Sequence, residues 1–170
     1  MKKTFFGICL LFLTAIYATP VMAADGGHEG WYAKVGTASD DDAANDSPST
    51  LVYGAGYRFN HWFGLEYDMM APRQYDYGTT TYTVNVSSFY AAFRWEITNN
   101  FDINYKWGKS AVTVNTDADS GNTTETNTYG SSGPGIEIFL GNFILFAEKI
   151  GVSTDGDGSS DTTIGLGYQF

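Results

Sequence analysis

Beyond about residue 29, apolar and polar residues alternate along most of the chain. Residues 101–107, for example, carry Phe, Ile, Tyr and Trp at odd positions and Asp, Asn and Lys at even positions. A period of two is typical of β-strands whose two faces meet different surroundings. Clusters of Gly, Asp, Asn, Ser and Thr separate these segments. The pattern predicts eight strands, at residues 30–38, 50–59, 62–70, 82–97, 101–113, 129–140, 143–153 and 161–170.

The connections between these segments alternate in length. Short ones fall at residues 60–61, 98–100 and 141–142, and Gly141-Asn142 is a two-residue hairpin signal. The long polar ones cover residues 39–49, 71–81, 114–128 and 154–160. This alternation predicts an all-β fold, a single eight-stranded antiparallel up-and-down barrel with tight turns at one end and long loops at the other.

The seventh segment has apolar residues on both of its faces. Either Glu148 or Lys149 therefore belongs to its polar side, and the sequence leaves the phase open.

The first 23 residues have the features of a secretory signal peptide. Lys2 and Lys3 precede an apolar stretch, and residues 21–23 (Val-Met-Ala) place small residues at the −3 and −1 positions of a cleavage site. The apolar stretch has about 15 residues, which is short for a membrane helix. We expect cleavage to leave a domain at residues 24–170, with cleavage after Ala24 as the alternative. Cys9 is the chain's single cysteine, so that domain would contain no disulfide and no thiol chemistry.

Composition and charge exclude several classes of protein. The abundance of Gly (20), Tyr (12) and Phe (12) argues against a disordered chain and against a helical bundle. The formal net charge is −10, and it becomes −12 once the two leader lysines are removed. Such an excess of acid repels phosphates, so no nucleic-acid partner is expected.

The two faces of the predicted strands differ in a way that bears on their surroundings. One face carries bulky aromatic and aliphatic side chains, and the other carries charged residues and glycines. A soluble barrel buries its apolar face, whereas a small barrel in a bilayer turns that face to lipid and keeps polar and small residues inside. On the polar face, the numbers of basic and acidic residues are nearly equal, as expected for a buried network of ion pairs. We therefore predict a transmembrane barrel, with a soluble barrel as the alternative, and a lumen charge network of Lys34, Arg58, Glu66, Asp68, Arg94, Glu96, Lys106 and Glu137.

Three segments carry a resemblance to a known family. The final residues 164–170 alternate apolar side chains and end in an aromatic, residues 30–36 read Gly-Trp-Tyr-Ala-Lys-Val-Gly, and residues 53–58 interleave glycine with tyrosine. The chain resembles the small eight-stranded outer-membrane barrels, which include the transmembrane part of outer membrane protein A and outer membrane proteins X and W. This resemblance implies a bacterial outer-membrane location, periplasmic termini and extracellular long loops. It also implies a monomer in contact with outer-membrane lipid and lipopolysaccharide, with Tyr168 and Phe170 in a C-terminal signal for the barrel-assembly machinery.

Candidate chemistry is sparse. His28 and His61 are both expected on the short-turn side, away from the outer rim where an enzyme of this kind would act, and no nucleophile elbow or histidine metal pair occurs. We predict no catalytic residues, no cofactor and no dedicated metal site. Acidic residues in the long loops offer weak binding to Ca²⁺ or Mg²⁺, which prefer oxygen ligands; they are Asp40, Asp41, Asp42, Asp46, Asp117, Asp119, Glu125, Asp155, Asp157 and Asp161.

The expected function is a structural or surface-interaction role with a lumen largely filled by side chains. The alternative is a narrow ion or small-solute pore. A soluble periplasmic binding barrel and an outer-membrane enzyme are less favoured.

Overall fold

The computed structural model describes residues 28–41, 49–118, 121–153 and 158–170. The predicted signal peptide therefore lies outside the described residues. Within them, no helix is long and apolar enough to cross a membrane. The chain forms eight strands: β1 (Gly30–Asp40), β2 (Thr50–Asn60), β3 (Phe63–Tyr77), β4 (Thr80–Thr98), β5 (Phe101–Asp117), β6 (Thr123–Leu140), β7 (Phe143–Ser153) and β8 (Ser159–Gln169).

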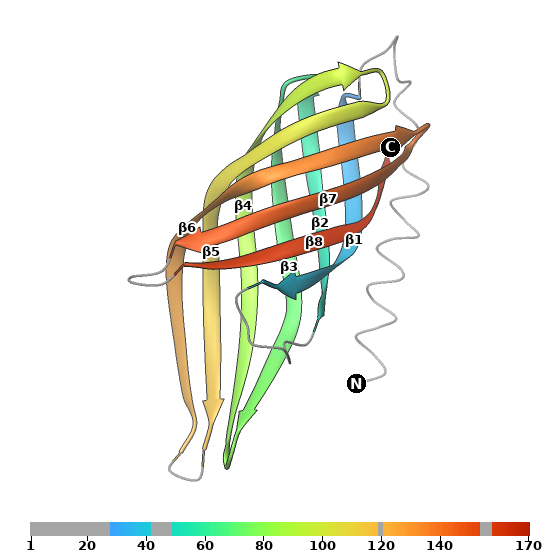
Figure 1. Ribbon diagram of the computed structural model, residues 1–170. Coiled ribbons are helices and arrows are strands. Elements are labelled where there is room, and N and C mark those ends of the chain that lie inside the picture. Colours follow the sequence, from blue (N-terminus) through green and yellow to red (C-terminus); the bar gives the residue numbers. More distant parts are fainter. Residues whose placement is uncertain (1–27, 42–48, 119–120, 154–157) are drawn as a thin grey trace.

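Consecutive strands pair antiparallel, and the sheet closes on itself (Figure 1). The closing pair joins β1 to β8 in register from Tyr32 opposite Gln169 to Asp40 opposite Asp161. Closure gives every barrel strand two hydrogen-bonded neighbours, which a bilayer demands because lipid offers the backbone no other partner. The predicted up-and-down barrel is confirmed.

The two ends of the barrel differ, as the connection lengths predict. Residues 61–62, 99–100 and 141–142 make the tight turns at one end, here called the short-turn end. The opposite end is called the long-loop end. There the predicted loop at 71–81 was wrong, because β3 continues to Tyr77 and turns into β4 through Gly78 and Thr79. Gly78 has a φ of 63°, a conformation that favours glycine.

Much of the loop predicted at 114–128 is also strand. β3 to β6 have 15, 19, 17 and 18 residues, whereas the other four strands have 11 each. The added segments are rich in Thr and Val, as in residues 80–86 and 111–116, and β-branched residues favour extended backbone. The polar residues of these segments predicted loops. A sheet with both faces in water also carries polar residues on both faces, so polarity alone does not separate the two.

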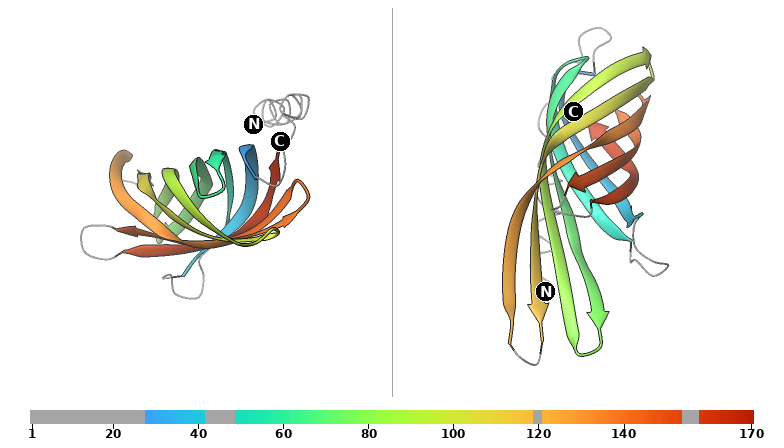
Figure 2. Two further views of the ribbon diagram at one scale, coloured as in Figure 1. Left: turned by 90° about the horizontal axis from the view of Figure 1, so that it is seen from above. Right: turned by 60° about the vertical axis from the view of Figure 1, so that its left-hand side comes forward.

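The extended strands form a sheet that projects beyond the closed barrel (Figure 2). The pairing of β2 with β3 stops at Val52 opposite Met70, and that of β6 with β7 stops at Gly130 opposite Ser153. Beyond these points β3 to β6 pair only with one another. We call this part the protruding sheet; it comprises residues 73–77, 80–86, 111–117 and 123–129. Its two edges are residues 73–77 of β3 and 123–129 of β6.

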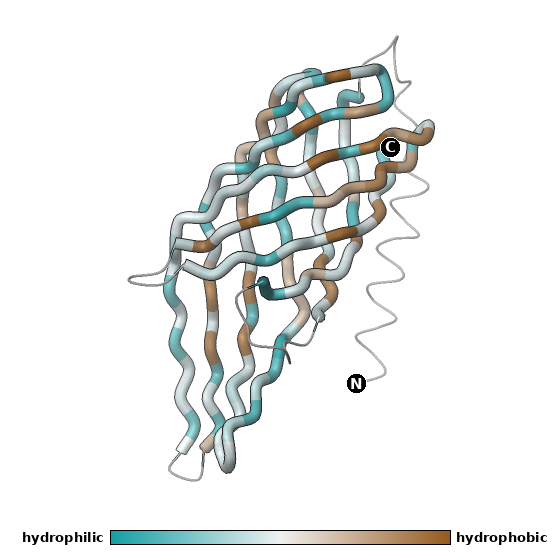
Figure 3. The backbone as a smooth tube through the Cα atoms, viewed as in Figure 1, coloured by the Kyte–Doolittle hydropathy of each residue, from teal (hydrophilic) through white to brown (hydrophobic). Residues whose placement is uncertain are grey.

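The outer surface of the barrel is apolar. Trp31, Leu51 and Trp107 are more than half exposed, and hydrophobic positions recur along the barrel strands with paler or hydrophilic ones between them (Figure 3). Contacting aromatic rings follow the short-turn end in the series Trp31, Tyr57, Phe59, Phe63 and Phe93. Such a surface suits lipid and an aromatic belt at its boundary.

Glycines allow neighbouring strands to approach closely at several inward positions. A Cβ at Gly108 would lie 1.9 Å from the backbone oxygen of Phe89, whereas a Cβ at Gly130 would have nothing within 4 Å. We expect Gly108→Ala to lower the free energy of unfolding by about 1–3 kcal/mol, because the backbone must move to relieve the clash. Gly130→Ala is the matched control and should change it little. Urea unfolding in lipid vesicles, followed by tryptophan fluorescence, measures both; equal effects would contradict the close approach.

Candidate functional site in the barrel lumen

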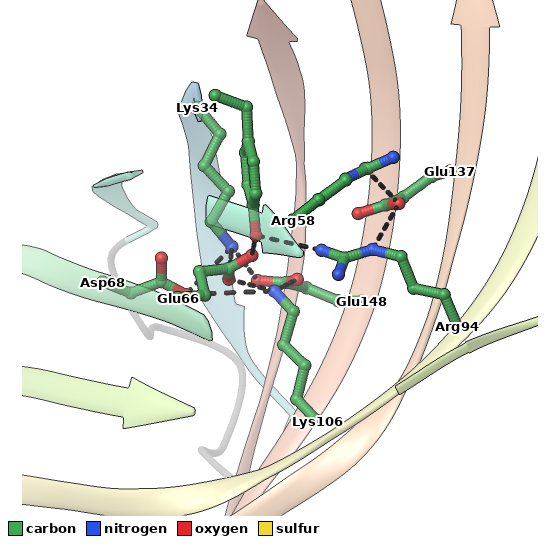
Figure 4. A network of polar contacts seen from close by, with 9 residues as sticks. Lys34, Arg58, Glu66, Asp68, Arg94, Lys106, Glu137 and Glu148 are labelled. Carbon is green, nitrogen blue, oxygen red and sulfur yellow. Dashed lines mark hydrogen bonds and ion pairs between the residues drawn. The ribbon is translucent and has the colours of Figure 1, made fainter. Parts of the chain in front are cut away.

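Charged side chains from several strands meet inside the barrel (Figure 4). In one group, here called the lysine cluster, two ammonium groups lie among three carboxylates. Lys34 Nζ is 2.6 Å from Glu66, 2.9 Å from Asp68 and 2.9 Å from Glu148. Lys106 contacts Glu66 and Glu148 and lies 4.0 Å from Asp68. None of the five residues is more than 7% exposed.

A second group, here called the arginine cluster, lies beside the first. Glu137 Oε2 accepts hydrogen bonds from Arg58 Nη2 at 2.6 Å and from Arg94 Nε at 3.2 Å. Asp102 lies 4.0 Å from Arg58 Nη1. Tyr32 joins the two clusters, since its hydroxyl donates to Glu66 at 2.5 Å and accepts from Arg94 Nη2 at 3.0 Å.

Strand periodicity explains why these side chains converge. Each occupies an inward position, and glycines on neighbouring strands leave room for it. A Cβ at Gly56 would lie 2.4 Å from the ring of Tyr32, and one at Gly54 would lie 2.0 Å from Asp68 Oδ1. With side chains of this length crossing between strands, an eight-stranded lumen is filled.

Seven of the eight predicted network residues lie in these clusters. The structure corrects the eighth, because Glu96 is exposed. Glu96 lies two residues beyond Arg94 toward the short-turn end, opposite Asp102 on β5, where the lumen ends and the side chain reaches water.

Three further members were not part of the predicted network. Glu148 settles the open phase of the seventh strand: it points inward with Phe146, and Lys149 points outward. Tyr32 and Asp102 were also omitted, although they share a strand face with Lys34 and Lys106 respectively. Period-two spacing alone was sufficient to find both.

The lumen is closed by apolar packing toward the short-turn end. Phe139, Ile144 and Phe146 form a buried cluster with Tyr32. His28 stacks on Phe139 with ring centroids 3.8 Å apart, and Arg58 Cζ lies 4.8 Å from the centroid of the same Phe139 ring. His28 Nε2 is also 3.1 Å from the backbone oxygen of Asn99, in a tight turn.

Toward the long-loop end, the lumen contains a cavity of about 40 Å³. Asp68 and Glu148 of the lysine cluster are among its lining residues, together with Asp161 near the rim. At the rim, Arg73 pairs with Asp161 at 3.0 Å and with Asp40 at 3.6 Å. Arg73 belongs to β3, and its partners belong to β8 and β1. These ion pairs therefore connect strands across the long-loop end of the barrel.

A second ion pair holds the chain just beyond β1. Asp41 Oδ2 lies 2.9 Å from Lys149 Nζ and accepts a hydrogen bond from Thr162 at 2.9 Å. The hydrogen bond from Lys149, followed by that from Thr162, lowers the pKa of the Asp41 carboxyl. A lowered pKa in the folded state means that the stabilisation is present at neutral pH and is lost as pH falls through that pKa.

We expect Lys149→Met to raise the pKa of Asp41 back toward the ordinary aspartate range, since the largest cause of its depression is then gone. An NMR titration of carboxyl-labelled aspartate in the purified barrel measures this shift. An unchanged Asp41 titration would show that the ion pair does not form.

Three of the five described acidic residues that were expected to bind divalent cations are ion-paired with basic side chains. Asp40 and Asp161 pair with Arg73, and Asp41 pairs with Lys149. Asp117 and Glu125 belong to strands of the protruding sheet. The remaining acids of that prediction lie outside the described residues: Asp42, Asp46, Asp119, Asp155 and Asp157.

Comparison with known proteins places the chain in a family. Residues 10–170 match the family model described as the outer membrane protein beta-barrel domain. The chain belongs to the outer membrane β-barrel family. Its location is therefore the bacterial outer membrane, and the apolar outer face meets lipid. A search of curated proteins gives no match.

Solved structures of outer membrane β-barrels share the fold at low sequence identity. Ail, the attachment invasion locus protein of Yersinia pestis, matches with a TM-score of 0.62 and 16% identity over 84% of this chain and 99% of its own. The N-terminal barrel domain of Pseudomonas aeruginosa OprF gives 0.67 and 15% over 85% and 99%. Neisserial surface protein A gives 0.62 and 17% over 83% and 97%. These three solved structures thus share the barrel architecture of this chain.

Proposed function

We propose that this outer membrane β-barrel has a structural or surface-interaction role, and that it presents the protruding sheet outside the cell. The observation that carries the proposal is the β6 edge. Residues 123–129 pair with β5 on one side only and include a single charged residue, Glu125, and no proline. Edge strands are commonly protected by charge or proline, and an unprotected edge offers its backbone groups to an extended segment of a partner.

The opposite edge of the protruding sheet differs. Residues 73–77 of β3 include the charged residues Arg73 and Asp76 and directly follow Pro72, and both charge and proline discourage pairing with another strand. The contrast favours β6 as the interacting edge. The name of the structurally similar Ail refers to attachment and invasion, and a surface role here accords with it.

The proposed orientation places the long-loop end outside the cell and both termini in the periplasm. The C-terminal strand would then carry the signal for the barrel-assembly machinery. Tyr168 faces outward, and its ring packs edge-on against Phe143 and Phe170 at 5.3 Å in each case. The protein would be a monomer, with its apolar outer face in contact with lipid and its rim near lipopolysaccharide.

Cysteine labelling in intact cells tests this orientation. Thr126→Cys places a thiol on the β6 edge, and Asn99→Cys places one in an exposed tight turn. We expect a membrane-impermeant maleimide to label Thr126→Cys in intact cells and Asn99→Cys only after permeabilisation. The predicted loss of Cys9 with the leader keeps the background low. The reverse labelling pattern would refute the proposal.

The alternative function is a narrow ion or small-solute pore, which needs a continuous wet path. A charged lumen favours it, but Arg58, Arg94 and Lys106 are among the most deeply buried side chains described, and their contacts cross between strands. These contacts support a closed lumen.

A further inference from the structure

The two faces of the β6 edge present different side chains to a strand that pairs there. Side chains alternate between the faces of a strand, so Glu125 shares the inner face of the sheet with Glu137, twelve residues further along β6. The opposite face carries three exposed threonines: Thr124, Thr126 and Thr128. On that face Thr126 Oγ1 lies 2.9 Å from Thr113 Oγ1, so a threonine pair already joins β6 to β5.

About half of the backbone N–H and C=O groups of the β6 edge point away from β5. In an antiparallel ladder, alternate residues hydrogen-bond to one neighbouring strand and the residues between them face the other side. β6 pairs with β7 only from Gly130 onward, so these outward groups meet no second strand among the described residues. The seven residues of the edge span about 23 Å, which accommodates an added strand of ordinary length.

The exposed charges of the protruding sheet all have the same sign. Its charged residues are Arg73, Asp76, Asp117 and Glu125. Arg73 is 6% exposed and pairs with acids at the rim, whereas the three carboxylates are exposed. The chain as a whole has a formal net charge of −10. The protruding sheet therefore attracts cationic partners and repels anionic ones.

Charge also argues against a second copy of this chain as the partner. Antiparallel pairing of two β6 edges over all seven residues places Thr126 opposite Thr126 and brings the two Glu125 side chains to diagonal positions on one face. A register centred on Glu125 places the two carboxylates directly opposite each other. Like charges that face each other across a strand pair are destabilising, whereas opposite charges are stabilising.

We propose that the β6 edge binds an extended, basic segment of another polypeptide, which adds an antiparallel strand to the protruding sheet with a lysine or arginine opposite Glu125. The flanking residues of that segment lie opposite Thr124 and Thr126, where β-branched side chains make favourable cross-strand pairs. Backbone hydrogen bonds supply the affinity, and the side-chain pairs supply the selectivity. This inference rests on the proposed surface role of the β6 edge and adds the chemistry of the partner.

Two synthetic peptides test the proposal. Both are acetylated and amidated and read Thr-Gln-Thr-X-Thr-Gln-Thr, where X is lysine in one and glutamate in the other. The purified full-length barrel in detergent micelles is titrated with each peptide, and amide hydrogen exchange of the β6 edge is followed by NMR. We expect the peptide to protect the amides that point away from β5, and the lysine peptide to bind about threefold to tenfold more tightly than the glutamate peptide.

Two charge reversals separate pairing at Glu125 from the attraction of the whole molecule. Glu125→Lys should reverse the preference, so that the glutamate peptide binds more tightly. Asp76→Lys changes the net charge by the same amount at the opposite edge of the sheet and should keep the preference for the lysine peptide. A preference that survives Glu125→Lys, or that is lost equally in Asp76→Lys, would overturn the proposal.

The outcomes separate the basic partner from the use of the β6 edge itself. Protection of the edge by both peptides with equal affinity would refute the basic partner, while the edge would still add a strand. Absence of protection by either peptide would refute both. Protection that increases with barrel concentration in the absence of peptide would identify a second copy of the chain as the partner, and the proposal would fail.

Discussion

Replacing Glu137 by glutamine should destabilise the barrel by about 3–5 kcal/mol. Glu137 is the carboxylate shared by Arg58 and Arg94, both of which are at least 98% buried. The amide keeps the size of the side chain but removes the carboxylate that both guanidinium groups contact, and the other carboxylate of the cluster, Asp102, lies 4.0 Å from Arg58. Removing one partner of a buried ion pair costs far more than removing an exposed charge, because the remaining charge stays desolvated.

Glu96→Gln is the matched control for this prediction. It makes the same chemical change on an exposed side chain at the short-turn end, so we expect a change within about 0.5 kcal/mol. Urea unfolding in vesicles of fixed lipid composition compares the two variants with the unmodified protein. Similar losses for Glu137→Gln and Glu96→Gln would contradict the buried arginine cluster.

The second large effect is expected on the lipid face. Val35 points outward on β1, 46% exposed, and pairs with Tyr53 and Leu166, which also point outward. Val35→Lys would place an ammonium group in the hydrocarbon region, where a lysine on a barrel surface costs about 2–4 kcal/mol at the bilayer midplane. The unfolding free energy in vesicles should fall by that amount.

Ser39→Lys supplies the control on the same strand and the same face. Ser39 is four residues closer to the long-loop end and pairs with Thr162, above the apolar band. A lysine there should cost about 0–1 kcal/mol, since the penalty falls toward the interface. If Val35→Lys proved as harmless as Ser39→Lys, β1 would not face the hydrocarbon region.

Much of the fold follows from period-two alternation. The eight strands, their antiparallel order and the inward placement of Lys34, Arg58 and Lys106 all come from that single pattern. The resemblance carried by residues 164–170 points to the same family that the comparison with known proteins assigns. These features are predictable because each strand must present one face to lipid and the other to a narrow polar lumen.

The strand ends were harder to predict, for a physical reason. Alternation identifies the face of Glu96 but not its height in the barrel, which depends on the stagger between β4 and β5. Glu96 therefore joined the predicted network although it lies beyond the end of the lumen. The protruding sheet was not predicted for a different reason. Residues 71–77 and 123–128 carry no apolar face that would distinguish a strand from a loop.

The seventh strand shows a different limit. Ile144 and Phe146 point into the lumen, while Phe143 and Leu145 point outward. The inward pair packs with Phe139 and closes the lumen toward the short-turn end. Both faces of this strand therefore carry apolar side chains, and the difference in polarity that identifies the inward face is missing. Only the register with β6 and β8 fixes Glu148 as the inward residue.

Single-channel recording of the purified barrel in planar lipid bilayers tests the central claim, a lumen closed by its own ion-paired side chains. We expect no discrete conductance steps for the unmodified protein. The ion pairs of the lysine cluster bridge the lumen, and the apolar cluster around Phe139 fills it toward the short-turn end. Discrete steps in the unmodified protein, changed in size or ion preference by Glu66→Gln or Arg94→Gln, would contradict the closed lumen and establish the pore.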